Sequence, residues 1–298
     1  MPLLDAHNCY PYEGRWADRI DRALSAGFPV GIEQDIAWVG GRSVVAHDNK
    51  PRGGEPKLEK YFFERVRPMM ERALRENDRS SWPLIVLHFD FKDNSPENLR
   101  AVWKVLARHE RWITTGKKTA QDSEISPLDV RPILALTEDN ETQEQVFYRE
   151  VPIGAKLRLF GSARVDESFL AGLDKEQRKT ALATVAPERL VSAKPTNYRR
   201  WWNNSWYLVE RGGAPGAGDW TPQTEARLHS LVDYAHRLGY WIRFYTLDGF
   251  PTDEDKGWGE SYNFGSIDRA RERWQAALRE GVDMIATDQY EDLRAILH

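Results

Sequence analysis

Short apolar segments and amphipathic segments alternate along almost the whole chain. The segment 84–92 carries apolar residues on a strand-like alternation. The segment 58–75 instead places Phe62, Val66 and Met69 near the 3.6-residue period of a helix. The pattern predicts strands over 3–8, 29–39, 43–47, 84–92, 132–136, 157–161, 198–206, 241–247 and 284–287, and helices over 15–26, 58–75, 142–149, 175–185, 221–239, 267–280 and 290–297, with a further helix opening at Ser95-Pro96-Glu97.

This alternation predicts the fold class. Roughly eight strand–helix units favour an α/β fold of the (β/α)8 type, a TIM barrel, over an open doubly wound sheet. No glycine-rich dinucleotide fingerprint follows any of the predicted strands. A chain of 298 residues suits one large α/β domain or two small ones, and we predict a single catalytic barrel over residues 1–298.

Composition limits the classes of partner and of metal site that the chain could have. The net charge is −4, from 42 basic and 46 acidic residues, so no basic surplus points to nucleic acid. No run approaches the ~18 apolar residues of a membrane span. The single cysteine, Cys9, excludes an internal disulfide and a cysteine-rich zinc site. No signal peptide is visible, and the localisation stays open: secreted or periplasmic if a leader was trimmed, and otherwise cytoplasmic.

Candidate metal ligands occur where predicted strands end, which is where barrels of this type carry their chemistry. Strand alternation puts Glu33 and Asp35 on one face, and Asp90 and Lys92 together on the next strand. Three converging carboxylates repel one another unless a cation neutralises them, and all-oxygen ligation suits Mg²⁺ or Ca²⁺. Asn8 could add an amide oxygen. In the alternative interpretation, the carboxylates pair with Lys92 or arginines and bind no metal.

Two histidines and two cations complete the polar set. His7 and His47 flank the Glu33–Asp35 strand and could be a general acid and base, although a lone histidine at a strand end is more often structural. His88 is expected to make core hydrogen bonds, and His109 to lie on a helix surface. Lys92 and Arg243 would face an anionic group such as phosphate. The alternative for Arg243 is an ion pair across the barrel.

Aromatic residues gather in the segment 198–206. Trp201, Trp202 and Trp206 lie beside Asn203 and Asn204. Such a group can stack on sugar or polyol rings, meet a lipid interface, or belong to the core. We expect at least one of the three, with Trp202 as the candidate, to bind substrate at the mouth of the barrel.

The order of these motifs resembles the phospholipase C-like phosphodiesterase superfamily, which includes glycerophosphodiester phosphodiesterases, sphingomyelinase D-type enzymes and phosphoinositide-specific phospholipases C. The shared features are a histidine ending the first strand, an E-x-D strand, V-V-x-H-D over residues 44–48, an acid-x-Lys pair and a terminal G-V-D-x-I-x-T-D over residues 281–288. The resemblance implies a divalent metal held by Glu33, Asp35 and Asp90, a phosphate contact from Lys92 and two catalytic histidines, His7 and His47.

The opening motif departs from part of that superfamily. Glycerophosphodiesterases typically have His-Arg-Gly where this chain has His7-Asn8-Cys9. The His-Asn pair is more similar to calcium-dependent phosphoinositide phospholipases, whose asparagine is a metal ligand. The opening, together with E-x-D-x-x-W, is also similar to the altered-inheritance-of-mitochondria family. The resemblance therefore implies a reaction type and leaves the substrate open.

The prediction from sequence is a metal-dependent phosphodiesterase of lipid metabolism, a hydrolase that acts on a glycerophosphodiester or phospholipid-like substrate. One histidine would deprotonate the attacking hydroxyl and the other would protonate the leaving oxygen. A phospholipase-type lyase that releases a cyclic phosphate is one alternative. A carbohydrate-active or non-catalytic ligand-binding TIM barrel is another. We expect a monomer with a small-molecule or lipid substrate and one Mg²⁺ or Ca²⁺, and a peripheral membrane contact stays open.

Overall fold

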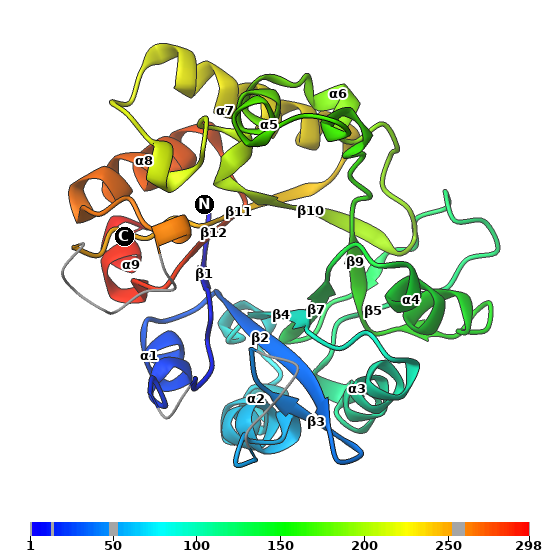
Figure 1. The fold of residues 1–298 in the computed structure, drawn as a ribbon. Coiled ribbons are helices and arrows are strands. Elements are labelled where there is room, and N and C mark those ends of the chain that lie inside the picture. Colours follow the sequence, from blue (N-terminus) through cyan, green and yellow to red (C-terminus); the bar gives the residue numbers. More distant parts are fainter. Residues whose placement is uncertain (1, 13–14, 48–52, 252–259, 298) are drawn as a thin grey trace. The chain divides into compact units, whose positions relative to one another are not determined.

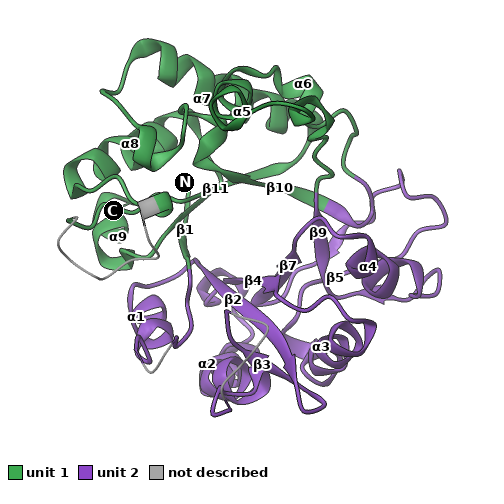
Figure 2. Cartoon of the chain, in the orientation of Figure 1, with its two compact units in different colours: residues 1–7, 163–195, 200–298 green, residues 8–162, 196–199 purple. Residues whose placement is uncertain are grey.

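The computed structural model describes residues 2–12, 15–47, 53–251 and 260–297. Its fold is a (β/α)8 barrel, as predicted (Figure 1). The chain divides into two compact units, and each is described by itself (Figure 2). Unit 1 comprises residues 1–7, 163–195 and 200–298, and unit 2 comprises residues 8–162 and 196–199. A single catalytic barrel over residues 1–298 stays a prediction. Asp48 of the V-V-x-H-D motif lies outside the described residues.

Unit 2 contains five strands of the main sheet in the order β9-β7-β4-β2-β3, all parallel except the antiparallel β3. These strands are β2 (Val30–Val39), β3 (Arg42–Val45), β4 (Ile85–Phe91), β7 (Ile133–Thr137) and β9 (Phe160–Ser162). Its helices are α1 (Arg19–Ser25), α2 (Glu64–Glu76), α3 (Pro96–Arg108) and α4 (Glu141–Glu144), with π-helical turns at Glu59–Phe63 and Gln145–Arg149. A small second sheet, which the sequence pattern did not predict, joins β5 (Thr115–Lys117), β6 (Leu128–Asp129) and β8 (Lys156–Leu157).

Unit 1 contains parallel strands in the order β1-β12-β11-β10. They are β1 (Leu3–Ala6), β10 (Arg199–Ser205, in this unit from residue 200), β11 (Trp241–Tyr245) and β12 (Met284–Thr287). The helices are α5 (Lys175–Thr184), α6 (Pro187–Leu190), α7 (Pro222–Leu238), α8 (Ile267–Glu280) and α9 (Tyr290–Leu297).

Local signals in the sequence explain where these helices begin and end. The Ser95 hydroxyl accepts a hydrogen bond from the Asn98 amide at the start of α3, and proline follows at the first helical position. At the end of α7, Gly239 takes a left-handed φ of 96°, a conformation that side chains with a Cβ rarely adopt. The predicted helix over 267–280 and the predicted strand over 284–287 agree with α8 and β12 residue for residue.

The core is apolar and includes most of the large aromatic residues. Trp201, Trp202 and Trp206 are fully buried. The prediction that His109 lies on a helix surface is wrong, because its ring is buried and stacks on Phe63 and Trp112 with centroid distances of 4.5 and 4.8 Å. The helical period alone marks residue 109 as the end of α3 and does not reveal that neighbouring elements cover it.

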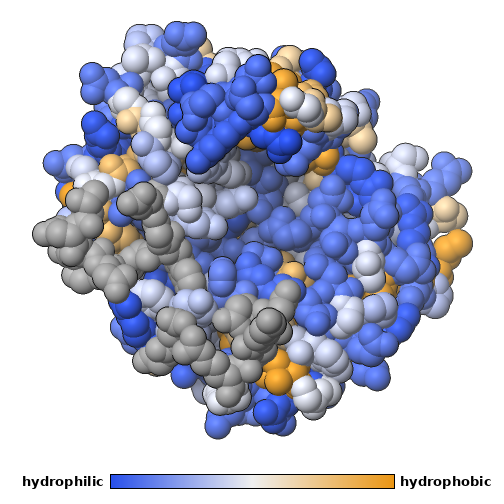
Figure 3. All heavy atoms as spheres, in the orientation of Figure 1, coloured by the Kyte–Doolittle hydropathy of each residue, from blue (hydrophilic) through white to orange (hydrophobic). Residues whose placement is uncertain are grey.

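The face of the molecule drawn in Figure 3 is mainly hydrophilic. On the face drawn in Figure 3, hydrophobic residues form only small, separate patches among hydrophilic ones. Among the described residues, no helix has both the length and the apolar character that a bilayer crossing requires.

Candidate metal centre

Three carboxylates of unit 2 converge near the end of the segment over which β2 pairs with β4. Glu33 and Asp35 are two residues apart on β2, so their side chains share one face of the sheet. The parallel register pairs Asp35 with Asp90 of β4, and Glu33 with His88. One oxygen from each of Glu33, Asp35 and Asp90 lies within 4.8 Å of the other two. The structure therefore brings the three predicted ligands together, and metal binding by them stays a prediction.

The ammonium group of Lys92 is the cation that this cluster already contains. Its Nζ donates to Asp90 Oδ2 at 2.7 Å and lies 3.1 Å from Asp35 Oδ2. Burial disfavours the charged form of Lys92, but the attraction of Asp35 and Asp90 outweighs burial and raises its pKa. For Asp35, burial and then repulsion by Asp90 raise the pKa of the carboxyl group well above its ordinary value. The carboxylates thus repel one another even with the ammonium group of Lys92 beside them.

The segment that follows β1 places Asn8 beside the same cluster. The Tyr10 hydroxyl lies 2.8 Å from Asn8 Oδ1 and 2.7 Å from Asp35 Oδ2. Since a phenol has one proton, it donates to one of these oxygens at a time. Asn8 has a left-handed φ of 49°, and Arg19 donates to its carbonyl oxygen at 2.7 Å. These bonds hold the amide oxygen of Asn8 one hydroxyl group away from Asp35.

Two histidines lie near this cluster, in different settings. His47 is half-buried, with its ring 6.5 Å from Tyr10 and 5.5 Å from Tyr12. His88 is buried, with Nε2 2.7 Å from Glu138 Oε1 and Nδ1 3.9 Å from Glu33 Oε1. The hydrogen bond to Glu138 agrees with the core role predicted for His88. The role of His47 as a general acid or base stays a prediction.

Unit 1 contains a second polar cluster, built around His7. His7 Nδ1 lies 2.9 Å from Asp288 Oδ1. Asp248 Oδ1 accepts hydrogen bonds from the Thr287 hydroxyl at 2.6 Å and from the Asp288 amide at 2.7 Å. Burial, and then repulsion by Asp288, raises the pKa of Asp248 to about 7. Asp248 lies just beyond a predicted strand but is not one of the predicted site residues, and Asp288 belongs to the terminal motif alone.

The remaining predicted site residues belong to unit 1 and are buried in the protein. The Arg243 guanidinium group forms a buried ion pair with Asp5 and donates to Asn203 Oδ1 at 2.9 Å. This pairing is the alternative that the sequence left open for Arg243. Trp202 is fully buried. Its role in substrate binding stays a prediction. His7 belongs to unit 1 and His47 to unit 2, and their joint action also stays a prediction.

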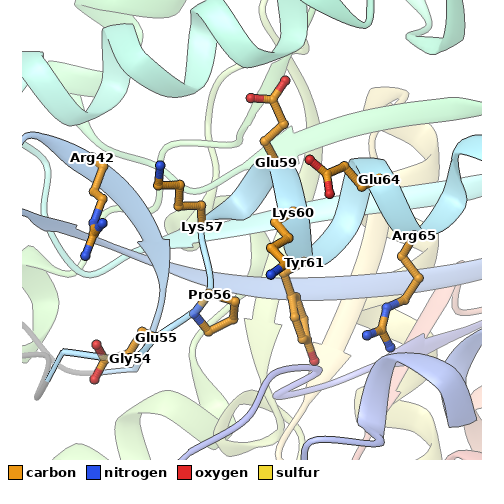
Figure 4. A pocket seen from close by; sticks show the side chains of 10 residues that line it. All are labelled: Arg42, Gly54, Glu55, Pro56, Lys57, Glu59, Lys60, Tyr61, Glu64 and Arg65. Carbon is orange, nitrogen blue, oxygen red and sulfur yellow. The ribbon is translucent and has the colours of Figure 1, made fainter.

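A surface pocket of about 670 Å³ in unit 2 does not include any of these residues (Figure 4). Basic side chains such as Arg42 and Lys57 and acidic ones such as Glu55 and Glu64 line it together. Because charges of both signs alternate around the pocket, it favours neither an anionic nor a cationic ligand.

Comparisons with known proteins give matches of fold only. No family model matches the sequence, and no curated protein does. Among solved structures, the chain resembles Plasmodium falciparum HPPK-DHPS with pterin and p-hydrobenzoate (TM-score 0.49, 9% identity, 100% of this chain and 47% of that one). It also resembles wild-type P. falciparum HPPK-DHPS with STZ-DHP (TM-score 0.46, 10% identity, 100% and 46%) and an HPPK-DHPS in complex with substrates (TM-score 0.48, 9% identity, 100% and 48%). The chain spans about half the length of these proteins.

These matches correct the predicted function. The structures that the chain resembles are HPPK-DHPS proteins and not phosphodiesterases. The prediction of a phosphoric diester hydrolase in lipid metabolism is therefore wrong, and a barrel outside the phospholipase C-like enzymes, which the sequence left open as an alternative, fits better. At this identity the likeness is one of fold, and it assigns no reaction or ligand to this chain.

Proposed function

We propose that the chain is a ligand-binding (β/α)8 barrel that holds one divalent cation, Mg²⁺ or Ca²⁺, through Glu33, Asp35 and Asp90. The cation would bind the oxygen atoms of a small polar ligand. The observation that carries this proposal is the convergence of three carboxylate oxygens within 4.8 Å of one another. The proposal concerns binding and assigns no reaction.

Charge supports a divalent cation at this place. With the three carboxylates ionised, the cluster would gather three negative charges in a largely buried setting beside the ammonium group of Lys92. Such charge is costly unless a counterion accompanies it. Carboxylate and amide oxygens are ligands that Mg²⁺ and Ca²⁺ prefer, and Asn8 could supply the amide oxygen. From the resemblance to phospholipase C-like barrels, we retain this layout of cation ligands alone.

The class of ligand follows from what surrounds the cluster. Asp90 and Lys92 are partly exposed, with 33% and 23% of their side chains accessible, so the cation would meet solvent on that side. A ligand with hydroxyl or carboxylate oxygens could replace the cation's waters there. The half-buried rings of Tyr12 and His47 could pack on its carbon skeleton. We therefore propose a polyol, sugar or hydroxy acid, bound by a monomer.

The same residues fit the active site of a carbohydrate-active enzyme less well than they fit a cation site. Glycosidases separate their two working carboxylates by ~5–5.5 Å or ~6.5–9.5 Å, which leaves room for the reacting sugar carbon. Here Asp35 and Asp90 share one ammonium group, and oxygens of all three carboxylates lie within 4.8 Å. This geometry supports shared neutralisation by a cation more than a divided acid and nucleophile.

Calorimetric titration of the chelator-treated full chain with Mg²⁺ and with Ca²⁺ tests the proposal. We expect one equivalent to bind, and we expect Glu33→Gln and Asp90→Asn each to abolish that binding. Asp93→Asn is the matched control, because the Asp93 carboxylate follows the same strand but caps the Ser95 amide at 2.8 Å. Wild-type protein that binds neither cation would overturn the proposal.

The ligand class has its own test. Thermal unfolding is followed with a panel of polyols, sugars and hydroxy acids, with and without the cation that binds. A ligand of the proposed kind should raise the melting temperature only when the cation is present, because ligand binding stabilises the folded state by mass action. If every compound that stabilises the protein does so equally with chelator, the cation does not mediate ligand binding.

A further inference from the structure

We propose that unit 1 contains a second metal site, in which His7, Asp248 and Asp288 bind a transition-metal dication such as Mn²⁺ or Zn²⁺. One ligand-type atom from each of the three side chains lies within 4.8 Å of the other two. All three residues are at least 95% buried. The site uses no residue of the cluster in unit 2, so it stands or falls independently of the proposed function.

The topology of unit 1 explains why residues so far apart in sequence meet. His7 directly follows β1, Asp288 directly follows β12, and Asp248 lies three residues beyond the end of β11. These strands are neighbours in the order β1-β12-β11 and run parallel, so their carboxyl ends lie at the same edge. The register pairs Ala6 with Thr287, which sets the next residues, His7 and Asp288, side by side.

Asp248 provides the observation that points to a bound ion. Its Oδ1 atom accepts two hydrogen bonds, from the Thr287 hydroxyl and the Asp288 amide. Its Oδ2 atom is fully buried and has no hydrogen-bond partner among the described residues. A buried carboxylate oxygen that lacks a donor is unfavourable, and a second carboxylate, Asp288, lies in the same cluster. A dication between them would satisfy this oxygen and offset both charges.

Hydrogen bonds from outside the ligand set hold the cluster in place. The Tyr290 hydroxyl donates to the His7 carbonyl oxygen at 2.7 Å, and the His7 amide donates to the Thr287 carbonyl oxygen at 3.2 Å. The two bonds to Asp248 Oδ1 fix its carboxylate, so that Oδ2 is the oxygen left for a ligand role. Partners of this kind orient the ligands of protein metal sites and tune their affinity.

The donor set selects the class of metal. One imidazole nitrogen and two carboxylate oxygens suit Mn²⁺, Fe²⁺ or Zn²⁺ better than Ca²⁺, which prefers oxygen alone. In the structure, His7 Nδ1 is 2.9 Å from Asp288 Oδ1, so a proton lies between them. Imidazole ligates in its neutral form and carboxylate in its ionised form, so a metal bound at Nδ1 would displace the proton from between these two atoms. His7 would then be a metal ligand instead of the acid or base predicted from sequence.

Electron spin echo spectroscopy of bound Mn²⁺ can separate this site from the one in unit 2. The full chain is treated with chelator, loaded with Mn²⁺ and examined for ¹⁴N modulation, which a directly bound imidazole produces and an all-oxygen site lacks. We expect the modulation in wild type and in Glu33→Gln, but not in His7→Ala. His229→Ala is the matched control, because His229 is an exposed histidine paired with Glu280, and its modulation should match wild type.

Affinity measurements complete the test. In the Glu33→Gln background, Asp248→Asn keeps the shape of the side chain and should weaken Mn²⁺ binding by at least ~10-fold, the scale on which even outer-shell changes act. Circular dichroism checks that each variant is folded. If the variants do not fold, NMR of wild-type protein with ¹⁵N-labelled histidine tests the site instead. Zn²⁺ should then shift the ring resonances of His7, whose ring stacks on Tyr245.

Three results would overturn the second site. Wild-type protein could bind Mn²⁺ without ¹⁴N modulation, or the modulation could persist in His7→Ala. Unchanged histidine resonances on addition of Zn²⁺ would count equally against it. Any of these would leave His7, Asp248 and Asp288 as a hydrogen-bonded cluster without a metal, and none would bear on the cation site of unit 2.

Discussion

Asp35 of β2 and Asp90 of β4 are register partners in neighbouring parallel strands, and the ammonium group of Lys92 contacts an oxygen of each. Parallel strands bring residues at equivalent positions close together, so both carboxylates occupy the same edge. Lys92 is two residues beyond Asp90, so alternation directs it to the same face. The ammonium group of Lys92 therefore already occupies the place beside these carboxylates. Removing it tests whether it competes with a bound metal ion.

Replacing Lys92 by methionine should strengthen the binding of a divalent cation to unit 2. A neighbouring ammonium group repels the incoming ion. Two unit charges ~4 Å apart repel by at least ~1 kcal/mol, so removing the ammonium charge from beside a doubly charged ion is worth at least ~2 kcal/mol, and affinity should rise by ~10-fold or more. Titration calorimetry measures the change. Lys57→Met, which alters an exposed lysine of the same unit, should have no effect. Weaker binding in Lys92→Met would mean that Lys92 supports the ion instead of competing with it.

Replacing Tyr10 by phenylalanine should loosen Asp35 and Asn8 together. The hydroxyl group contacts an oxygen of each residue, so its loss leaves two buried acceptors with fewer donors. We expect a loss of ~1–3 kcal/mol in the free energy of unfolding and weaker cation binding. Urea denaturation and calorimetry measure the two effects. Tyr12→Phe serves for comparison and should leave cation affinity at the wild-type value.

Glu144 should make the stability of the protein depend on pH. Burial would raise its pKa, but hydrogen bonds from Arg199 at 2.6 Å and Arg149 at 2.7 Å outweigh burial and lower the pKa below 4.5. The folded state therefore favours the ionised form. Its contribution is fully present above the unfolded value of about 4.5 and is lost as the pH falls through the lowered folded value.

Glu144→Gln is the variant that checks this dependence. It should cost ~2 kcal/mol of unfolding free energy at pH 7, the scale of a hydrogen bond to a charged group, and much less at pH 3. Urea denaturation at both pH values gives the difference from wild type. Glu124→Gln, at an exposed position of the same unit, should show a small difference at both. An equal loss at both pH values would attribute the effect to side-chain packing.

Gly161 should tolerate no side chain. A Cβ built there would lie 2.4 Å from Cε1 of Tyr198, a fully buried ring that stacks on Tyr148. Since the ring cannot move aside without disturbing the core, Gly161→Ala should destabilise the protein by ~1–3 kcal/mol. Thermal unfolding measures the loss. Gly218→Ala meets no atom within 4 Å and should melt close to wild type. Equal melting temperatures for the two variants would contradict the packing that places Tyr198 against Gly161.

The prediction of a phosphodiesterase reaction rested on the residue types of a few motifs. His7 directly follows β1 and the acid-x-Lys pair lies at the end of β4, whereas Glu33 and Asp35 lie within β2, where it pairs with β4. Barrels of this type share strand ends that present polar residues, and unrelated chemistries use them. Polar residues at such positions therefore do not by themselves specify a reaction.

By itself, the sequence determined the elements and the face on which Glu33 and Asp35 lie, because apolar period, caps and strand alternation are local properties. Only the tertiary structure decided which distant residues meet. His7 and Asp288 are 281 positions apart and become neighbours through the pairing of β1 with β12. The same holds for the ion pair of Arg243 with Asp5, since partner choice depends on how strands align, and no short stretch of sequence encodes that alignment.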